Sequence, residues 1–151
     1  MGYIPLPEVW EDEFVSIQER YKRGVFALDT ALFLHDLTDR TPHKFHMAFP
    51  YGYNTSSPKA AGILCSCKKE PYYSLGIALV DTPAGNTVRA YNAEKTLCEI
   101  LKPISHTDIQ IITDAFKRYA GRKDKNIPLL SEYAHQLRVE KRLRPYLEVL
   151  L

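Results

Sequence analysis

The pattern of the sequence changes at Asn92, and this change constrains the fold more than any other feature of the chain. Before it, short runs with alternating apolar residues are separated by segments rich in Gly, Pro, Asn and Ser, which is typical of strands and turns. After it, apolar residues recur every three or four positions, which is typical of amphipathic helices. A chain that places its strands before such a helical half is expected to fold as an α+β domain.

Two helices are expected ahead of the strands. The first has an apolar stripe whose members are spaced by four, three and four residues, namely Trp10, Phe14, Ile17 and Tyr21. Gly24 should end this helix, because glycine is a poor helix former. A second, shorter helix is expected over residues 31–37, and Pro42 should prevent any continuation.

The middle of the chain is expected to form four strands and no helix. The runs with strand character are residues 44–50, 62–68, 75–81 and 87–91. Residues 51–60 (YGYNTSSPKA) are dense in Gly, Asn, Ser and Pro, so we expect a surface loop there. Residues 83–86 supply a turn, which should pair the last two strands. The sheet is therefore expected to be small, four-stranded and mostly antiparallel.

The C-terminal half is expected to form four helices, over residues 92–101, 109–119, 126–137 and 139–151. Asn92, Asn126 and the segment 105–108 (SHTD) can supply N-terminal caps. Gly121 should end the second of these helices, and Pro145 should break or restart the last. The expected fold class is therefore α+β, with about six helices packed against the sheet.

Length and composition fit one domain. The 151 residues are 45% hydrophobic and 25% charged, with no internal repeat, so they can bury one core. The longest uncharged stretches are too short to span a bilayer, and the N-terminus lacks the basic and apolar regions of a signal peptide. Three cysteines is an odd number, which favours free thiols. We therefore expect a cytoplasmic protein without a membrane partner.

Charge is distributed unevenly along the chain. Residues 1–20 carry five acidic residues against one basic residue, whereas residues 114–151 carry nine basic residues against five acidic ones. A basic end of this kind can contact phosphates or an acidic protein partner, and it can equally be a solvated helix surface. The candidate contact residues are Lys117, Arg118, Arg122, Lys123, Lys125, Arg138, Lys141, Arg142 and Arg144. Within this set, Arg138, Lys141 and Arg142 are expected to share one helix face.

No motif of a known catalytic or cofactor-binding class occurs in the sequence. A phosphate-binding loop, a dinucleotide-binding glycine motif, a G-x-S-x-G elbow, an H-E-x-x-H helix and a kinase signature are all missing. Cys65-x-Cys67 lacks the second cysteine pair that zinc sites use. His43 and His46 could complete such a site, or the cysteines could be ordinary strand residues. We predict no metal site and no cofactor.

Two further groups of residues have both a catalytic and a structural interpretation. His35 could act as a general base, but beside apolar helix residues it fits a packed or capping role better. Asp39 and Arg40 could be a catalytic carboxylate with its anion-binding partner, and they could equally form a local ion pair that fixes the turn before Pro42. We favour the structural interpretations and therefore predict no catalytic residue and no enzymatic activity.

Two strings of the sequence are specific enough to compare with known families. Residues 30–42 read TALFLHDLTDRTP, and residues 91–98 read YNAEKTLC. Shorter strings occur in the same order at residues 49–50, 52–54, 82–89, 133–134, 138–139 and 146–151. Together they resemble the AbiEi-type antitoxins of abortive-infection (type IV) toxin–antitoxin systems, whose segments read T-A-L-x-L-H-x-L-T-D-R-x-P and Y-N-x-E-R-T-L-C. The resemblance covers nearly all of residues 8–151.

The sequence departs from the family pattern at four positions. Lys95 stands where Arg is usual, and Glu99 stands where Asp is common. Asp36 replaces a frequent Gly, and Ala27 replaces a frequent Ser cap. These departures are mild and leave the resemblance intact, although they weaken any role carried over to those four residues.

The resemblance implies a regulatory protein of two parts. Family members carry an N-terminal winged helix that reads operator DNA and represses its own operon, and this chain has no room for it before Trp10. Met1 to Ile4 resembles the last strand of that wing. Residues 1–151 would then be a single antitoxin domain that counteracts a nucleotidyltransferase-like toxin, with or without direct binding. Operator DNA would be a partner in the full-length context and a weak ligand of this chain alone.

Two other functions stay open. A stand-alone DNA- or RNA-binding protein could use the basic C-terminal helices, and some of its aromatic residues could stack on bases. A nuclease of the restriction-enzyme type would need an acid followed by E-x-K on adjacent strands to hold Mg²⁺, and no E-x-K occurs in this sequence.

The string at residues 30–42 is expected to be structural whichever function holds. Leu32, Leu34 and Leu37 should lie in the core, with Asp39 and Arg40 fixing the turn.

Overall fold

The computed structural model describes residues 12–150. The predicted roles of Trp10 and of Met1 to Ile4 lie outside the described residues, as does Leu151. Five strands are described: β1 (Val25–Phe26), β2 (His46–Pro50), β3 (Leu64–Lys68), β4 (Ile77–Asp81) and β5 (Thr87–Tyr91). The helices are α2 (Glu13–Arg20), α3 (Leu28–Leu34), α4 (Ser56–Ala60), α5 (Ala93–Ile100), α6 (Ile109–Ala120), α7 (Ile127–Gln136) and α8 (Glu140–Leu150), with a short 3-10 helix η1 (Pro103–Ser105).

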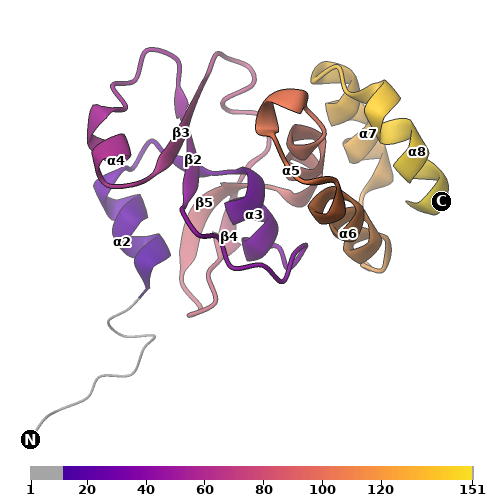
Figure 1. Cartoon of the computed structure of the whole chain (residues 1–151), viewed down its shortest axis with the longest axis horizontal. Coiled ribbons are helices and arrows are strands. Elements are labelled where there is room, and N and C mark those ends of the chain that lie inside the picture. The colour runs from indigo at the N-terminus through magenta and orange to yellow at the C-terminus, as the bar shows by residue number, and fades with distance from the viewer. Residues whose placement is uncertain (1–11, 151) are drawn as a thin grey trace, which may run out of the picture.

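The strands form one mixed sheet in the order β3-β2-β1-β5-β4, with α2 and α4 on one side of the molecule and α5 to α8 on the other (Figure 1). Strand β1 pairs antiparallel with β2 and parallel with β5. Strands β2 and β3 are parallel, whereas β4 and β5 are antiparallel. The expected combination of helices with one small sheet is confirmed, and within residues 12–150 it has seven α-helices and five strands.

The predicted four-stranded, mostly antiparallel sheet is wrong in two respects. Strand β1 is only two residues long, which is too short for an alternating pattern to reveal it. The segment 51–60, predicted as loop alone, contains α4, which connects β2 to β3 as a crossover. A crossover connection lets neighbouring strands run parallel, whereas a tight turn would make them antiparallel.

The predicted helix starts in the C-terminal half are confirmed by their caps. Asn92 Oδ1 accepts a hydrogen bond from Lys95 N at 2.8 Å, and Asp108 Oδ1 accepts one from Gln110 N at 2.7 Å. Asn126 Oδ1 accepts one from Leu129 N at 3.1 Å. Each cap satisfies a backbone N–H that has no partner inside its helix, so these polar residues fix where α5, α6 and α7 begin.

The predicted break at Pro145 is wrong, because α8 runs through it. The helix packs along α6, where the rings of Phe116 and Tyr146 stack with centroids 4.4 Å apart. Leu143 and Leu150 are buried on the same side of α8. Packing on both sides of Pro145 therefore outweighs the one backbone hydrogen bond that proline removes. None of the described helices has the length and apolar character needed to cross a membrane.

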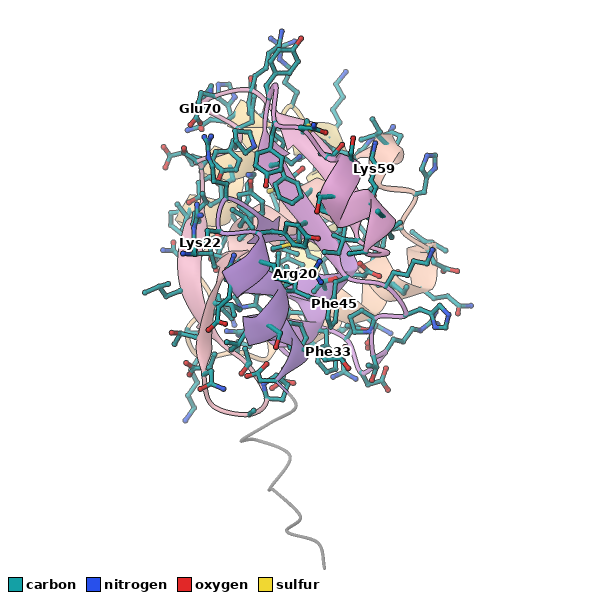
Figure 2. The ribbon with its side chains drawn as sticks, turned by 90° about the vertical axis from the view of Figure 1, so that its left-hand side faces the viewer. Arg20, Lys22, Phe33, Phe45, Lys59 and Glu70 are labelled. Carbon is teal, nitrogen blue, oxygen red and sulfur yellow. The ribbon has the colours of Figure 1, made fainter. Side chains whose placement is uncertain are left out.

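Two large clusters of buried apolar residues form most of the core. One joins α3 to the C-terminal helices, and Leu32 and Leu37 are fully buried in it together with Leu97. The other lies beneath α2, where the Phe14 ring stacks on those of Phe33 and Phe45. Figure 2 shows Phe33 and Phe45 beside one another on this side of the molecule.

The predictions for the string at residues 30–42 are confirmed only in part. Leu32 and Leu37 are core residues, but Leu34 is half-buried at the margin of the second cluster. The predicted ion pair between Asp39 and Arg40 is wrong. Arg40 N donates to Thr38 Oγ1 at 3.1 Å, which holds the turn. The Asp39 carboxylate is ion-paired instead with Arg118, a residue far away in the sequence, at 3.8 Å.

Candidate functional site

The nine predicted contact residues all lie in the helical half of the molecule, shown from brown to yellow in Figure 1. Lys117 and Arg118 are at the C-terminal end of α6. The loop from α6 to α7 contains Arg122, Lys123 and Lys125, and the turn from α7 to α8 contains Arg138. Helix α8 contains Lys141, Arg142 and Arg144.

Three of the nine residues have partners within the fold. Arg122 makes two hydrogen bonds of 2.8 Å to the Asp124 carboxylate and donates a third, also 2.8 Å, to His35 O at the end of α3. Lys125 Nζ donates to Ala120 O at 2.8 Å, which satisfies a carbonyl in the last turn of α6. Arg118 is ion-paired with Asp114 at 2.9 Å. These three side chains hold the loop and the helix ends in place.

The other six basic residues are exposed, and none has an ion-pair partner within residues 12–150; they are Lys117, Lys123, Arg138, Lys141, Arg142 and Arg144. The prediction that Arg138, Lys141 and Arg142 share a helix face is wrong. Arg138 precedes α8 and has a left-handed backbone with φ of 60°. On α8 itself, Lys141 and Arg144 are three residues apart and therefore lie on one face.

His35 connects the sheet to the helical half. Its Nε2 lies 2.8 Å from Tyr91 O, and it is the C-terminal cap residue of α3. Burial lowers the pKa of His35, so the imidazole is neutral at physiological pH. A half-buried side chain with a backbone partner fits the packed or capping role that the sequence favoured over a general base.

A buried ion network lies where α5 meets β3, and sequence reasoning missed it. Lys95 is fully buried and donates to Tyr72 O at 2.8 Å and to Leu75 O at 2.9 Å. Glu99 Oε1 lies 3.3 Å from Lys95 Nζ and 3.1 Å from Lys68 Nζ. Burial lowers the pKa of Lys95 to about 8 although Glu99 opposes that change. The i, i+4 spacing of Lys95 and Glu99 was the one available signal.

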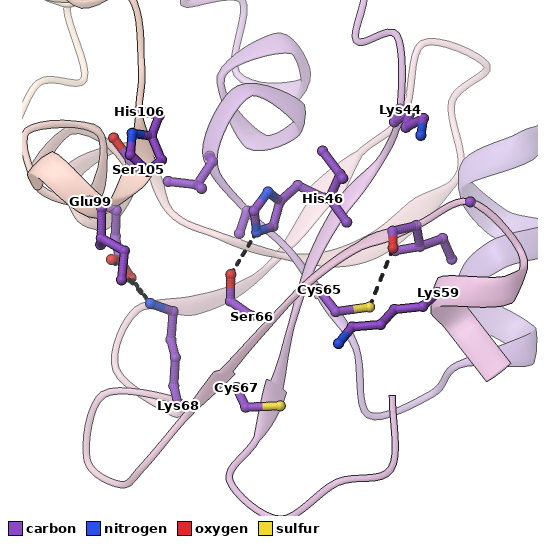
Figure 3. Close-up of a pocket in the computed structure, with 16 residues that line it drawn as sticks. Lys44, His46, Lys59, Cys65, Ser66, Cys67, Lys68, Glu99, Ser105 and His106 are labelled. Atoms are coloured by element: carbon purple, nitrogen blue, oxygen red, sulfur yellow. Dashed lines mark hydrogen bonds and ion pairs between the residues drawn. The ribbon is translucent and has the colours of Figure 1, made fainter. Parts of the chain in front are cut away.

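A cavity with a volume of about 760 Å³ follows strand β3 (Figure 3). His46 Nε2 lies 2.6 Å from Ser66 Oγ on its floor. Burial lowers the pKa of His46 to about 4, so this imidazole is neutral at physiological pH. A neutral imidazole can accept a hydrogen bond from a neighbouring hydroxyl. Lys68 and Glu99 also line the cavity.

The cysteines and histidines of the zinc alternative are not gathered at one point. Cys65 Sγ donates to Ile63 O at 3.5 Å, while His46 is bonded to Ser66. Among residues 12–150, no three side chains of His, Cys, Asp or Glu are close enough to hold a metal ion. Burial raises the pKa of the Cys65 thiol, which makes this side chain a poorer metal ligand.

Comparison with known proteins did not identify a relative: no family model matches the chain, and no match was found among curated proteins. The resemblance to the AbiEi-type antitoxins therefore stays a prediction from the residues quoted above. The geometry offers two surfaces to a partner, namely the six exposed basic residues of the helical half and the cavity along β3.

Proposed function

We propose that this chain is the antitoxin domain of a type IV toxin–antitoxin system, a non-enzymatic module that counteracts a nucleotidyltransferase-like toxin. In a protein that also carries a winged helix, the domain would support repression of its own operon. The candidate contact surface is the set of exposed basic residues on the helical half.

The observation that carries this proposal is that the two strings resembling the family lie against one another. His35 from the first string is hydrogen-bonded to Tyr91 O of the second, and Leu32 packs in one cluster with Leu97. Thr30 Oγ1 accepts a hydrogen bond from His46 N at 2.9 Å. Residues that are 56 positions apart in the chain thus build one junction between the sheet and the helices, which supports a resemblance of the whole domain rather than of isolated strings.

The roles of these strings also support a binding module. Their polar side chains satisfy backbone groups and each other inside the fold: Asn92 caps α5, and Lys95 is buried against Glu99. These side chains therefore stabilise the fold. The six exposed basic residues without an ion-pair partner within residues 12–150 lie instead on α6, on α8 and in the segments between these helices. Such a surface can contact an acidic protein or a phosphate backbone.

Growth rescue tests this proposal. The chain is produced in cells that also express a nucleotidyltransferase-like toxin, and colony formation is measured with and without the chain. We expect restored growth from the wild-type chain, and no change in cells carrying a catalytically inactive toxin. Failure to restore growth, with the folded chain present in the cell lysate, would contradict the proposal.

The second candidate is a stand-alone nucleic-acid-binding protein, and the six unpaired basic residues favour it. Such binding would rest on phosphate contacts, so it should show no sequence preference and weaken steeply with salt. A gel-shift titration at two salt concentrations measures both properties. Tight, salt-sensitive binding by a chain that does not rescue growth would replace the antitoxin proposal with this one.

A further inference from the structure

Strand β3 leaves one edge of the sheet open. It is the first strand in the sheet order and pairs only with β2. In this parallel register, Leu64 N donates to Phe45 O and Lys68 O accepts from Tyr51 N, so alternate residues of β3 face β2. The N–H and C=O groups of Cys65 and Cys67 therefore point away from the sheet, and they have no hydrogen-bond partner among the described residues.

The cavity of about 760 Å³ lies along this open edge. On one side it is bounded by the connection between α4 and β3, and on the other by η1 and the residues after it (Figure 3). Exposed apolar side chains, Leu64 and Ile104, lie at its margin. Leu28 and His106, both of which line it, have left-handed backbones with φ of 51° and 53°. Strained backbone of this kind is often found at binding sites.

The charges around the cavity favour an anionic ligand. Lys44, Lys59 and Lys68 line it, and Figure 3 shows them at separate points around the opening. The one carboxylate among its described lining residues is Glu99, which is already engaged by Lys68 and by the buried Lys95. The cavity therefore carries a net positive charge beside unpaired backbone donors and acceptors.

We propose that the open edge of β3 binds an extended acidic segment of a partner protein as an added strand. The backbone of the segment pairs with Cys65 and Cys67, which supplies affinity, and its carboxylates lie near Lys44 and Lys59, which supplies the preference for acidic residues. This proposal is independent of the antitoxin function, because it uses a different surface from the basic helices.

The opposite edge of the sheet provides a contrast. Strand β4 pairs only with β5. Because Asn92 N donates to Gly76 O and Thr82 N donates to Asn86 O, the backbone N–H and C=O of Leu79 point away from the sheet. No lysine lies on β4, and Asp81 would repel an acidic segment. A proline at Leu79 removes an outward N–H just as a proline at Cys67 does, so the two substitutions are matched.

A peptide selection tests the proposal. A phage library of random octapeptides is panned against the wild-type chain and counter-selected against the Cys67→Pro chain. We expect enrichment of acidic sequences with β-branched residues at alternate positions. The most enriched peptide is then synthesised with a fluorescent label, and its binding is measured by anisotropy, with circular dichroism used to show that each variant is folded.

Binding should weaken by at least about tenfold for Cys67→Pro and for a peptide with N-methylated alternate amides, because both remove backbone pairing. It should be unchanged for Leu79→Pro. The double variant Lys44→Glu and Lys59→Glu should also lose binding, while Lys22→Glu with Arg23→Glu should not. If Cys67→Pro does not fold, the N-methylated peptide tests the backbone pairing on the wild-type chain.

Several outcomes would overturn the proposal. Selection of no peptide, or of basic peptides, would contradict an acidic strand as the occupant. Binding that survives N-methylation would contradict strand addition. An oligo(dT) strand that competes for the cavity and binds more tightly than the peptide would assign the site to nucleic acid. A dimer in sedimentation that Cys67→Pro dissociates would assign the edge to a second copy of this chain.

Discussion

Two regions of the molecule, the start of the helical half beside the sheet and its C-terminal end, use charge in opposite ways. At the junction with the sheet, Lys95 and Glu99 are buried and ion-paired with each other, and Lys95 also donates hydrogen bonds to backbone carbonyls. On the helical half, Lys141 and Arg144 are exposed and have no ion-pair partner within residues 12–150. The difference shows that a basic residue in this sequence can belong either to the fold or to a surface, and that only its surroundings distinguish the two.

The largest expected effect comes from breaking the buried network. Glu99→Leu leaves the Lys95 ammonium without its carboxylate, and we expect a loss of about 3–5 kcal/mol in the free energy of unfolding. The double variant Lys95→Met with Glu99→Leu should recover most of that loss, because no buried charge then remains unpaired. Urea unfolding of both variants measures the difference. If Glu99→Leu alone lowers the free energy of unfolding by less than about 1 kcal/mol, water reaches Lys95 and the account of a buried ion network is wrong.

The next effect separates core from margin within one helix. Leu32→Ala should cost about 2–5 kcal/mol, because Leu32 is fully buried in the larger cluster. Leu34→Ala should cost about half as much, because Leu34 is only partly buried. Urea unfolding of the two variants side by side measures the comparison. Equal losses would mean that both positions lie in one core.

The third effect compares two adjacent basic residues. Arg122→Ala removes the contacts to His35 O and Asp124, so it should cost about 1–2 kcal/mol. Lys123→Ala is its matched control, because Lys123 is exposed and should change stability by less than about 0.5 kcal/mol. Thermal and urea unfolding check both values. A loss at Lys123 as large as that at Arg122 would contradict the division between structural and surface charges.

The fourth effect is a pH dependence. The pKa of His46 is lowered from 6.5 to about 4 in the folded chain, so below pH 6.5 the unfolded chain binds a proton that the folded chain does not. His46 therefore contributes stability that is present above that pH and is lost as the pH falls towards 4. We expect wild type to lose more stability than His46→Gln between about pH 7 and pH 5. Parallel slopes for the two chains would refute the assignment.

The sequence predicted the helical half better than the sheet, for physical reasons. Helix starts depend on local chemistry, and the caps Asn92, Asp108 and Asn126 are all in place. Strand pairing depends on residues far apart in the chain, so β1 and the parallel pairing of β2 with β3 were missed. Pro145 was misjudged because packing of α8 on α6 is not visible from the residue alone.

The candidate sites were predicted only in part. The exposed basic residues could be found by counting charges, because residues 114–151 carry nine basic residues against five acidic ones. Their division into structural and free members could not, because Arg122 and Lys125 are held by backbone carbonyls that have no signature in the sequence. The cavity along β3 was missed because it depends on sheet order, which places one strand at an edge.

The central claim is that the exposed basic residues of the helical half serve the antitoxin function and not the fold. Its most direct test is a growth-rescue titration of the triple variant Arg138→Glu, Lys141→Glu and Arg142→Glu against the nucleotidyltransferase-like toxin. The matched control reverses three charges on the far side of the molecule, Arg20, Lys22 and Arg23, two of which are labelled in Figure 2.

Both triple variants should keep wild-type stability within about 1 kcal/mol, because exposed charges contribute little to folding. At equal protein levels in the cell, the account predicts that the helical-half variant loses rescue while the control variant retains it. Full rescue by the helical-half variant would contradict the account and leave these residues as a solvated surface.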